Sequence, residues 1–160
     1  MTDEMIPEIS EFGSVDPAPA SNNGDVVELR SVLCNEEEKM FQRMRALFAL
    51  RNIGGVDAVE SLAAGFNSKS ALLKHEIAYV LGQMQDKHAI IFLIERLNDA
   101  SEDLMVRHEA AEALGAIGDR QAMEVLEKFR SDPEPVISES CEVAIDLLKW
   151  VESKKLDYSD

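Results

Sequence analysis

The chain has 160 residues, of which 46% are hydrophobic, so it is long and apolar enough to bury a core and is not disordered throughout. Its 31 acidic and 16 basic side chains give a net charge of −15. This charge disfavours nucleic acids and anionic membranes and favours a cationic partner, although an acidic surface can also serve solubility alone. No apolar run approaches the roughly 20 residues that span a bilayer.

Two observations predict a cytoplasmic location. The N-terminus, MTDEMIPEIS, is acidic and lacks the basic and apolar regions of a secretory signal. Cys34 and Cys141 are expected to be free, mostly buried thiols, because disulfides are rare in reducing compartments.

Residues 1–24 show no sustained periodicity. The stretch 14–24 is rich in Pro, Ser, Asn and Gly, which break helices. We interpret 1–24 as a flexible leader or linker. From Asp25 onward, apolar residues recur at three- and four-residue spacing, which predicts amphipathic helices over a repeat domain at 25–153, followed by a tail at 154–160.

The repeat domain contains four similar segments, at 44–50, 75–81, 108–114 and 139–145, separated by 31 to 33 residues. After each of the first three segments come a helix breaker and a second helix, at 56–66, 89–97 and 123–129. Asp86 and Asp119 are expected to cap the helices that follow them. Because one helical hairpin cannot bury both its faces, such repeats stack, and we predict an all-α protein built as a short α-solenoid.

Stacking explains the small residues at matched positions, Ala78 with Ala111 and Gly82 with Gly115, but it does not explain the paired His-Glu dipeptides. His75-Glu76 and His108-Glu109 occupy the same position in the two central repeats. Matched positions on stacked helices lie roughly 8–10 Å apart, so the two imidazoles could converge on one metal ion. Nitrogen and carboxylate ligands suit iron, manganese or zinc. The alternative is that each pair is a polar contact on the repeat surface.

The segments around these dipeptides resemble the deoxyhypusine hydroxylase family. The resemblance is strongest in Leu73-Lys74-His75-Glu76 and in the run from Met105 to Gly118, and it covers about 14–150. It implies HEAT-like repeats and a di-iron enzyme that hydroxylates the aminobutyl arm of deoxyhypusine, a spermidine-modified lysine of a eukaryotic translation initiation factor. Fe(II), with two irons per complete site, would be the cofactor and O2 the co-substrate.

By matched motif, the resemblance implies that His75, Glu76, His108 and Glu109 are iron ligands. Glu109 would also be the catalytic carboxylate near the substrate amine, and Glu76 and Glu109 would contact the substrate. Family members carry four His-Glu motifs in two halves, whereas this chain has two and resembles the C-terminal half. Its two-iron site would then need a separate half-domain or a second copy of the chain, unless the protein is an inactive remnant.

Two further hypotheses compete with the hydroxylase. One is a non-catalytic acidic HEAT-repeat module that binds a basic protein partner through its charge. The other is a repeat protein similar to bilin lyases, whose repeats also resemble the segment Ala113-Leu114-Gly115-Ala116-Ile117-Gly118-Asp119. The paired His-Glu dipeptides give no reason to prefer the bilin lyases.

Overall fold

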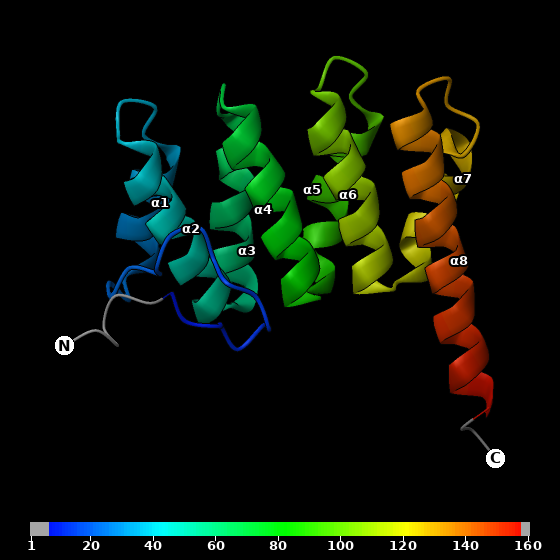
Figure 1. Ribbon diagram of the computed structural model, residues 1–160, viewed down its shortest axis with the longest axis horizontal. Helices are drawn as coiled ribbons and strands as arrows, with labels where there is room; N and C mark the ends of the chain where they lie inside the picture. The colour runs from blue at the N-terminus through cyan, green and yellow to red at the C-terminus, as the bar shows by residue number, and fades with distance from the viewer. Residues whose placement is uncertain (1–6, 158–160) are drawn as a thin grey trace. The chain divides into compact units, whose positions relative to one another are not determined.

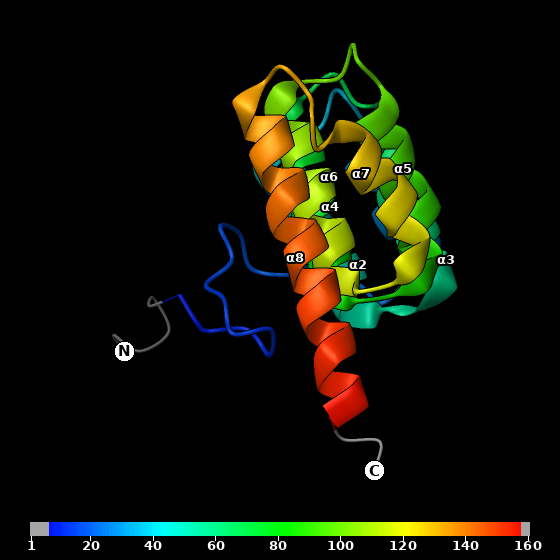
Figure 2. The ribbon, with the colours of Figure 1, turned by 90° about the vertical axis from the view of Figure 1, so that its right-hand side faces the viewer.

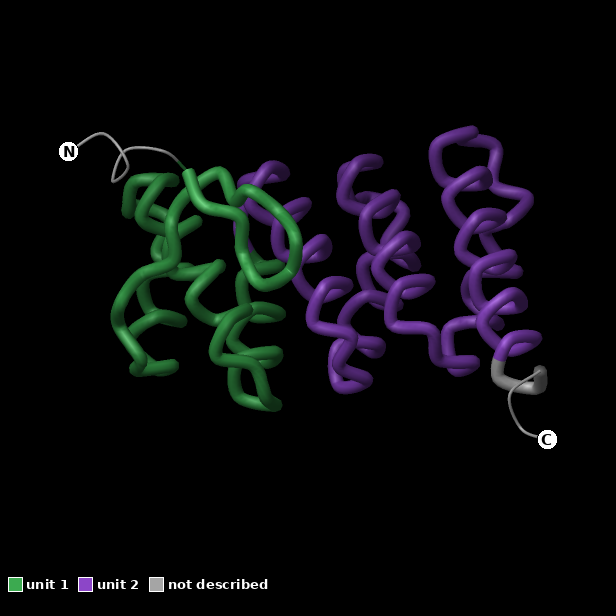
Figure 3. Tube along the Cα trace, turned by 60° about the horizontal axis from the view of Figure 1, so that its bottom comes forward, with its two compact units in different colours: residues 1–67 green, residues 68–160 purple. Residues whose placement is uncertain are grey.

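A computed structural model describes residues 7–157, with side chains through residue 154. Apart from one isolated bridge between Ile9 and Val15, the described residues form helices, turns and irregular segments, which confirms the all-α prediction. The chain divides into two compact units, residues 1–67 and 68–160 (Figure 3).

Unit 1 contains the helices α1 (Val26–Cys34), α2 (Met40–Ile53) and α3 (Gly55–Ala64) and a 3-10 turn, η2 (Gly65–Asn67). Asp25 starts α1, because its carboxylate accepts hydrogen bonds from the first-turn amides of Val27 and Glu28. The buried side chain of Arg43 on α2 donates from Nε to the carbonyl oxygen of Leu33 near the end of α1, 2.9 Å away. This bond satisfies a carbonyl that the helix end leaves unpaired.

The segment before α1 was predicted to be a flexible leader, and its described part, 7–24, contacts α2. The Arg51 guanidinium on α2 bonds both oxygens of the Asp16 carboxylate, at 2.9 and 2.6 Å. Its Cζ also lies 4.5 Å from the centre of the Phe12 ring. Arg45 Nε donates to the carbonyl oxygen of Pro19 at 3.0 Å. Residues 1–6 lie outside the described residues.

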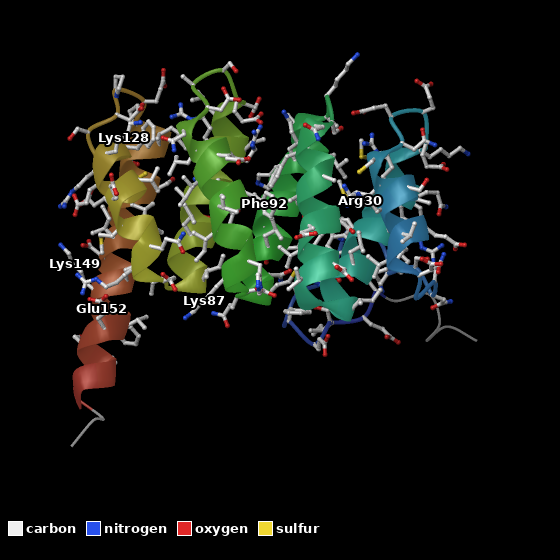
Figure 4. The ribbon with its side chains drawn as sticks, turned by 180° about the vertical axis from the view of Figure 1, so that it is seen from behind. Arg30, Lys87, Phe92, Lys128, Lys149 and Glu152 are labelled. Atoms are coloured by element: carbon white, nitrogen blue, oxygen red, sulfur yellow. The ribbon has the colours of Figure 1, made fainter. Side chains whose placement is uncertain are left out.

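Unit 2 contains two layers of helices. Within it, α4 (Ala71–Met84), α6 (Leu104–Ile117) and α8 (Pro135–Asp157) lie side by side, while α5 (Ile90–Asn98) and α7 (Met123–Phe129) form the second layer (Figures 1 and 2). Short 3-10 turns, η3 (Lys87–Ala89) and η4 (Arg120–Ala122), lead into α5 and α7. Seen from behind, Phe92 and Lys128 mark the second layer (Figure 4).

Capping residues fix where the helices of unit 2 begin. The Ser70 hydroxyl accepts from the Leu73 amide at the start of α4, and the Asp103 carboxylate accepts from the Met105 amide at the start of α6. Asp86 and Asp119 are N-caps, as predicted, and they cap the 3-10 turns that precede α5 and α7. The Ser70 and Asp103 caps therefore set the positions of His75 along α4 and of His108 along α6.

Small residues let the helices of the first layer approach closely, as the sequence predicts. A Cβ added to Gly82 on α4 would lie 3.0 Å from the Cα of Ala113 on α6. A Cβ added to Gly115 on α6 would lie 2.9 Å from the Cβ of Ala144 on α8. The distance at Gly115 is shorter than real Cβ contacts, and the distance at Gly82 is tighter than most, so a larger residue at either position would have to push its neighbour away.

Three other predictions can be compared with the structure. Helix α8 continues through Asp157, into the residues expected to form the tail, and residues 158–160 lie outside the described residues. Cys141 is a buried free thiol, as expected, but Cys34 is exposed because it closes the last turn of α1, so its predicted burial is wrong. Among the described residues, no helix is both long and apolar enough to cross a membrane.

Candidate metal and substrate site

One carboxylate connects the two histidines that the sequence singles out. Glu109 on α6 places Oε1 3.1 Å from Nε2 of His75 on α4. The same oxygen lies 3.6 Å from Nε2 of His108, its neighbour in the chain. The matched positions therefore bring His75, His108 and Glu109 together, on two helices whose spacing is fixed by the Gly82 contact.

A serine on α8 orients the ring of His108. The Ser140 hydroxyl donates to the carbonyl oxygen of Val136, so its oxygen accepts from Nδ1 of His108, 2.6 Å away. We infer that Nδ1 carries the proton and that Nε2 presents its lone pair. This arrangement, in which one ring nitrogen is fixed by a hydrogen bond and the other is left to bind, is typical of histidines that ligate metals.

Glu112 belongs to the same cluster, which sequence reasoning missed. It lies one helical turn after His108 on α6, and its Oε1 is 3.8 Å from Nε2 of His108. Ligand atoms of His108, Glu109 and Glu112 all lie within 4.8 Å of one another. The four-residue spacing from His108 to Glu112 was a usable signal, because residues at that spacing share a helix face.

The structure places Glu76 on the other side of the His75 ring. Its Oε1 lies 3.9 Å from Nδ1 of His75, whereas Glu109 faces Nε2. The two glutamates of the paired dipeptides therefore approach opposite nitrogens of one imidazole. Glu109 is at the centre of the cluster, and Glu76 is at its edge.

The electrostatics of Glu109 set it apart from the exposed carboxylates. Burial raises the pKa of Glu109, and the neighbouring Glu112 carboxylate raises it further, while His75 and His108 oppose the rise. A buried carboxylate beside a second carboxylate favours a bound cation or proton. In the neutral tautomer the lone pair of His108 Nε2 adds to that preference.

A groove begins at this cluster and runs between α4 and α6. It has a volume of about 320 Å³. A glycine and two alanines form its apolar part, and an aromatic ring, two amides and two carboxylates line the rest. Its lining residues are Tyr79, Gly82, Gln83, Gln85, Glu109, Glu112, Ala113 and Ala116.

Comparison with known proteins agrees with the resemblance seen in the sequence. The chain is 51% identical to deoxyhypusine hydroxylase of Gallus gallus over 154 residues, which cover 96% of this chain and 52% of that protein. It is 52% identical to deoxyhypusine hydroxylase of Arabidopsis thaliana, covering 92% of this chain and 48% of the relative. The solved structure of human deoxyhypusine hydroxylase in complex with glycerol superimposes with a TM-score of 0.88 at 46% identity, covering 92% of this chain and 51% of that one.

These matches confirm the predicted resemblance, and the chain spans about half the length of the curated relatives it matches. Two models of repeat families also match. The PBS lyase HEAT-like repeat covers residues 42–68, and the HEAT repeats model covers residues 66–146, more than half of the chain. The chain therefore belongs to the HEAT-repeat family.

Proposed function

We propose that this chain supplies half of an iron- and oxygen-dependent hydroxylase that acts on the deoxyhypusine side chain of a translation initiation factor. The observation that carries the proposal is the Glu109 carboxylate between the imidazoles of His75 and His108. Its support from outside the site is the similarity to deoxyhypusine hydroxylases over 92–96% of the chain.

The residues present fit an iron ion. Nε2 of His75 and Nε2 of His108 lie 3.1 and 3.6 Å from Oε1 of Glu109, and ligand atoms of His108, Glu109 and Glu112 lie within 4.8 Å of one another. The Ser140 hydrogen bond to Nδ1 of His108 leaves its Nε2 facing this cluster. This donor set suits iron, although it also suits manganese and zinc. His75, His108 and Glu109 would hold the ion, and bound iron would supply the activation of O2.

The other residues of the site have separate tasks. Ser140 keeps the His108 ring in the orientation and tautomer that a ligand needs. The negative charge of Glu109 and Glu76 would attract the ammonium groups of the substrate arm. The overall charge of −15 would add long-range attraction for that cation.

One chain provides too few ligands for two irons. Only two histidines occupy matched positions, His75 and His108. Glu76 approaches Nδ1 of His75, whereas Glu109 approaches Nε2, so the two carboxylates lie on opposite sides of the ring. We therefore propose that a second half-domain or a second copy of this chain completes the site. We also propose a cytoplasmic location without a membrane or nucleic-acid partner, which the free thiols of Cys34 and Cys141 and the net charge of −15 support.

The first test measures iron per chain after anaerobic loading with Fe(II) and desalting. Wild type is expected to keep about one iron per chain, and His75→Ala and His108→Ala are expected to lose it. His88→Ala is the matched control, because His88 is exposed and lies outside the cluster. Iron that survives in both His75→Ala and His108→Ala would contradict the proposed site.

The second test asks for turnover on a substrate that carries deoxyhypusine. The chain should hydroxylate it when the missing half is supplied, either by self-association or by a separate half-domain. A chain that keeps no iron yet binds a basic partner in a salt-sensitive manner would instead be an acidic binding module.

A further inference from the structure

The groove between α4 and α6 is lined largely by residues that are not among the proposed metal ligands. It extends along α6 from Glu109 to Ala116 and along α4 from Tyr79 to Gln85. Seven residues of helix correspond to about 10 Å, so the groove continues well beyond the cluster. Its position next to the cluster makes it a candidate for binding the substrate arm.

The walls of the groove suit a short alkyl chain. Gly82, Ala113 and Ala116 expose little more than backbone and methyl groups. The Tyr79 ring stands above them, 41% exposed, and Gln83 donates a 3.5 Å hydrogen bond to its hydroxyl. A tyrosine face can cover methylene groups and also attract a nearby cation.

The far end of the groove is closed by a residue in a costly conformation. Gln85 has φ +53°, in the left-handed region, whereas the matched position in the next repeat is Gly118 with φ +77°. The Gln85 side chain donates to the carbonyl oxygen of Ala116 at 2.9 Å and so spans the groove from α4 to α6. A glycine would fit the backbone better, so what the glutamine adds is its side chain in the groove.

Glu112 supplies the charge of the groove. Its side chain is 51% exposed, while that of Glu109 is 12% exposed. The two glutamates are three residues apart, a rise of about 4.5 Å along α6. Because ligand atoms of Glu109 and Glu112 lie within 4.8 Å of each other, a cation that contacts Glu112 would stand beside an ion held by Glu109.

We infer that this groove binds the terminal aminobutyl end of the substrate arm, with Glu112 as the counter-ion of its primary ammonium and Tyr79 against its methylene groups. The inference rests on the proposed function and adds Glu112 as a specificity residue. The carboxylate selects the charged end, and the small walls select an unbranched chain.

The test compares two short peptides that bind to the iron-loaded chain. One carries Nε-(4-aminobutyl)lysine, and the other carries Nε-pentyllysine, which has a methyl group where the first has the primary amine. Wild type should prefer the aminobutyl peptide, and Glu112→Gln should lose about five- to tenfold of its affinity for it while binding the pentyl peptide unchanged. Glu95→Gln is the matched control, because it removes the same charge from the exposed face of α5.

A steric variant gives an independent readout. Ala116→Leu should block the groove and weaken both peptides by about tenfold or more while keeping its iron, since Ala116 is exposed and lies two turns from His108.

Three results would overturn the inference: a wild type that does not distinguish the peptides, a Glu112→Gln that keeps the full preference, and a Glu112→Gln that loses its iron. The last would make Glu112 a metal ligand. Failure of the proposed function would give a different result: the wild-type chain would retain no iron, or it would not hydroxylate the substrate even when the missing half is supplied.

Discussion

The two units use the same repeat for opposite purposes. At the positions that carry His75 and Glu76 in α4, helix α2 has Met44, which is buried, and Arg45, which bonds Pro19. In unit 1 the residues before α1 cover this face of α2, and in unit 2 the corresponding face of α4 and α6 carries the histidines and the groove.

The difference shows that the repeat backbone does not determine whether a face is covered or exposed. Phe48 on α2 is buried at the position where α4 has the exposed Tyr79. In unit 1 the ion pair between Asp16 and Arg51 holds the segment before α1 against α2. Unit 2 leaves carboxylates and imidazoles partly exposed to solvent.

The largest expected effect is the loss of stability when the ion pair between Arg51 and Asp16 in unit 1 is removed. Arg51→Met removes a fully buried guanidinium from the Asp16 carboxylate and should lower the free energy of unfolding by about 3–5 kcal/mol, because a buried charge is left without its partner. Urea unfolding followed by circular dichroism measures it. Arg30→Met, at an exposed position of α1, is the control. A loss below about 1 kcal/mol would show that the segment before α1 contributes little.

The next effect concerns the histidines of unit 2. Ser140→Ala removes the acceptor that fixes the His108 ring and should weaken Fe(II) binding about 10- to 100-fold. Competition with a chelator measures the affinity. Ser138→Ala, whose hydroxyl bonds the Pro135 carbonyl on the same helix, should leave it unchanged. Equal affinities for wild type and Ser140→Ala would disprove the tautomer assignment.

A smaller effect concerns the packing that positions the site. Gly115→Ala introduces a Cβ within 2.9 Å of the Ala144 side chain. The clash should cost about 1–3 kcal/mol, of which the better helix propensity of alanine returns about 1. Gly24→Ala meets no atom within 4 Å and is the matched control. Thermal unfolding separates the two, and a Gly115→Ala variant as stable as wild type would mean that α8 moves aside freely.

The smallest effect is a difference in acid sensitivity. The Glu102 carboxylate is desolvated, but hydrogen bonds from Lys74, the Asp103 amide and Arg96 outweigh the burial and lower its pKa. A lowered pKa stabilises the folded chain above the ordinary value of about 4.5 and loses that contribution as the pH falls through the folded value. Glu102→Gln should therefore lose stability at pH 7 and show a shallower decline between pH 5 and 3 in urea titrations. An unchanged slope would refute this origin.

Much of the fold and part of the site follow from the sequence alone. The repeat period predicts the helices, and the matched dipeptides predict that His75, His108 and Glu109 lie together. Local periodicity contains this information because stacked repeats place equal positions side by side.

The remaining contacts need more than the repeat period. Asp16 reaches Arg51 across 35 residues, from a segment without periodicity. Ser140 lies one repeat from His108, but the period does not predict a serine there or its hydrogen bond to Nδ1. The sequence also did not predict which nitrogen of the His75 ring faces Glu76, because side-chain rotamers decide this and the repeat pattern does not encode them. Cys34 was misjudged because helix ends expose residues that a helical pattern would bury.

The contact between Gly82 and Ala113 sets the geometry of the histidine cluster. It sets how far α4 stands from α6, and therefore how far the His75 ring stands from the Glu109 carboxylate. A ligand set shared by two helices cannot be more accurate than the spacing between them. The geometry of this cluster therefore depends on Gly82 and Ala113, which lie one to two helical turns from the imidazoles and are among the smallest residues in the chain.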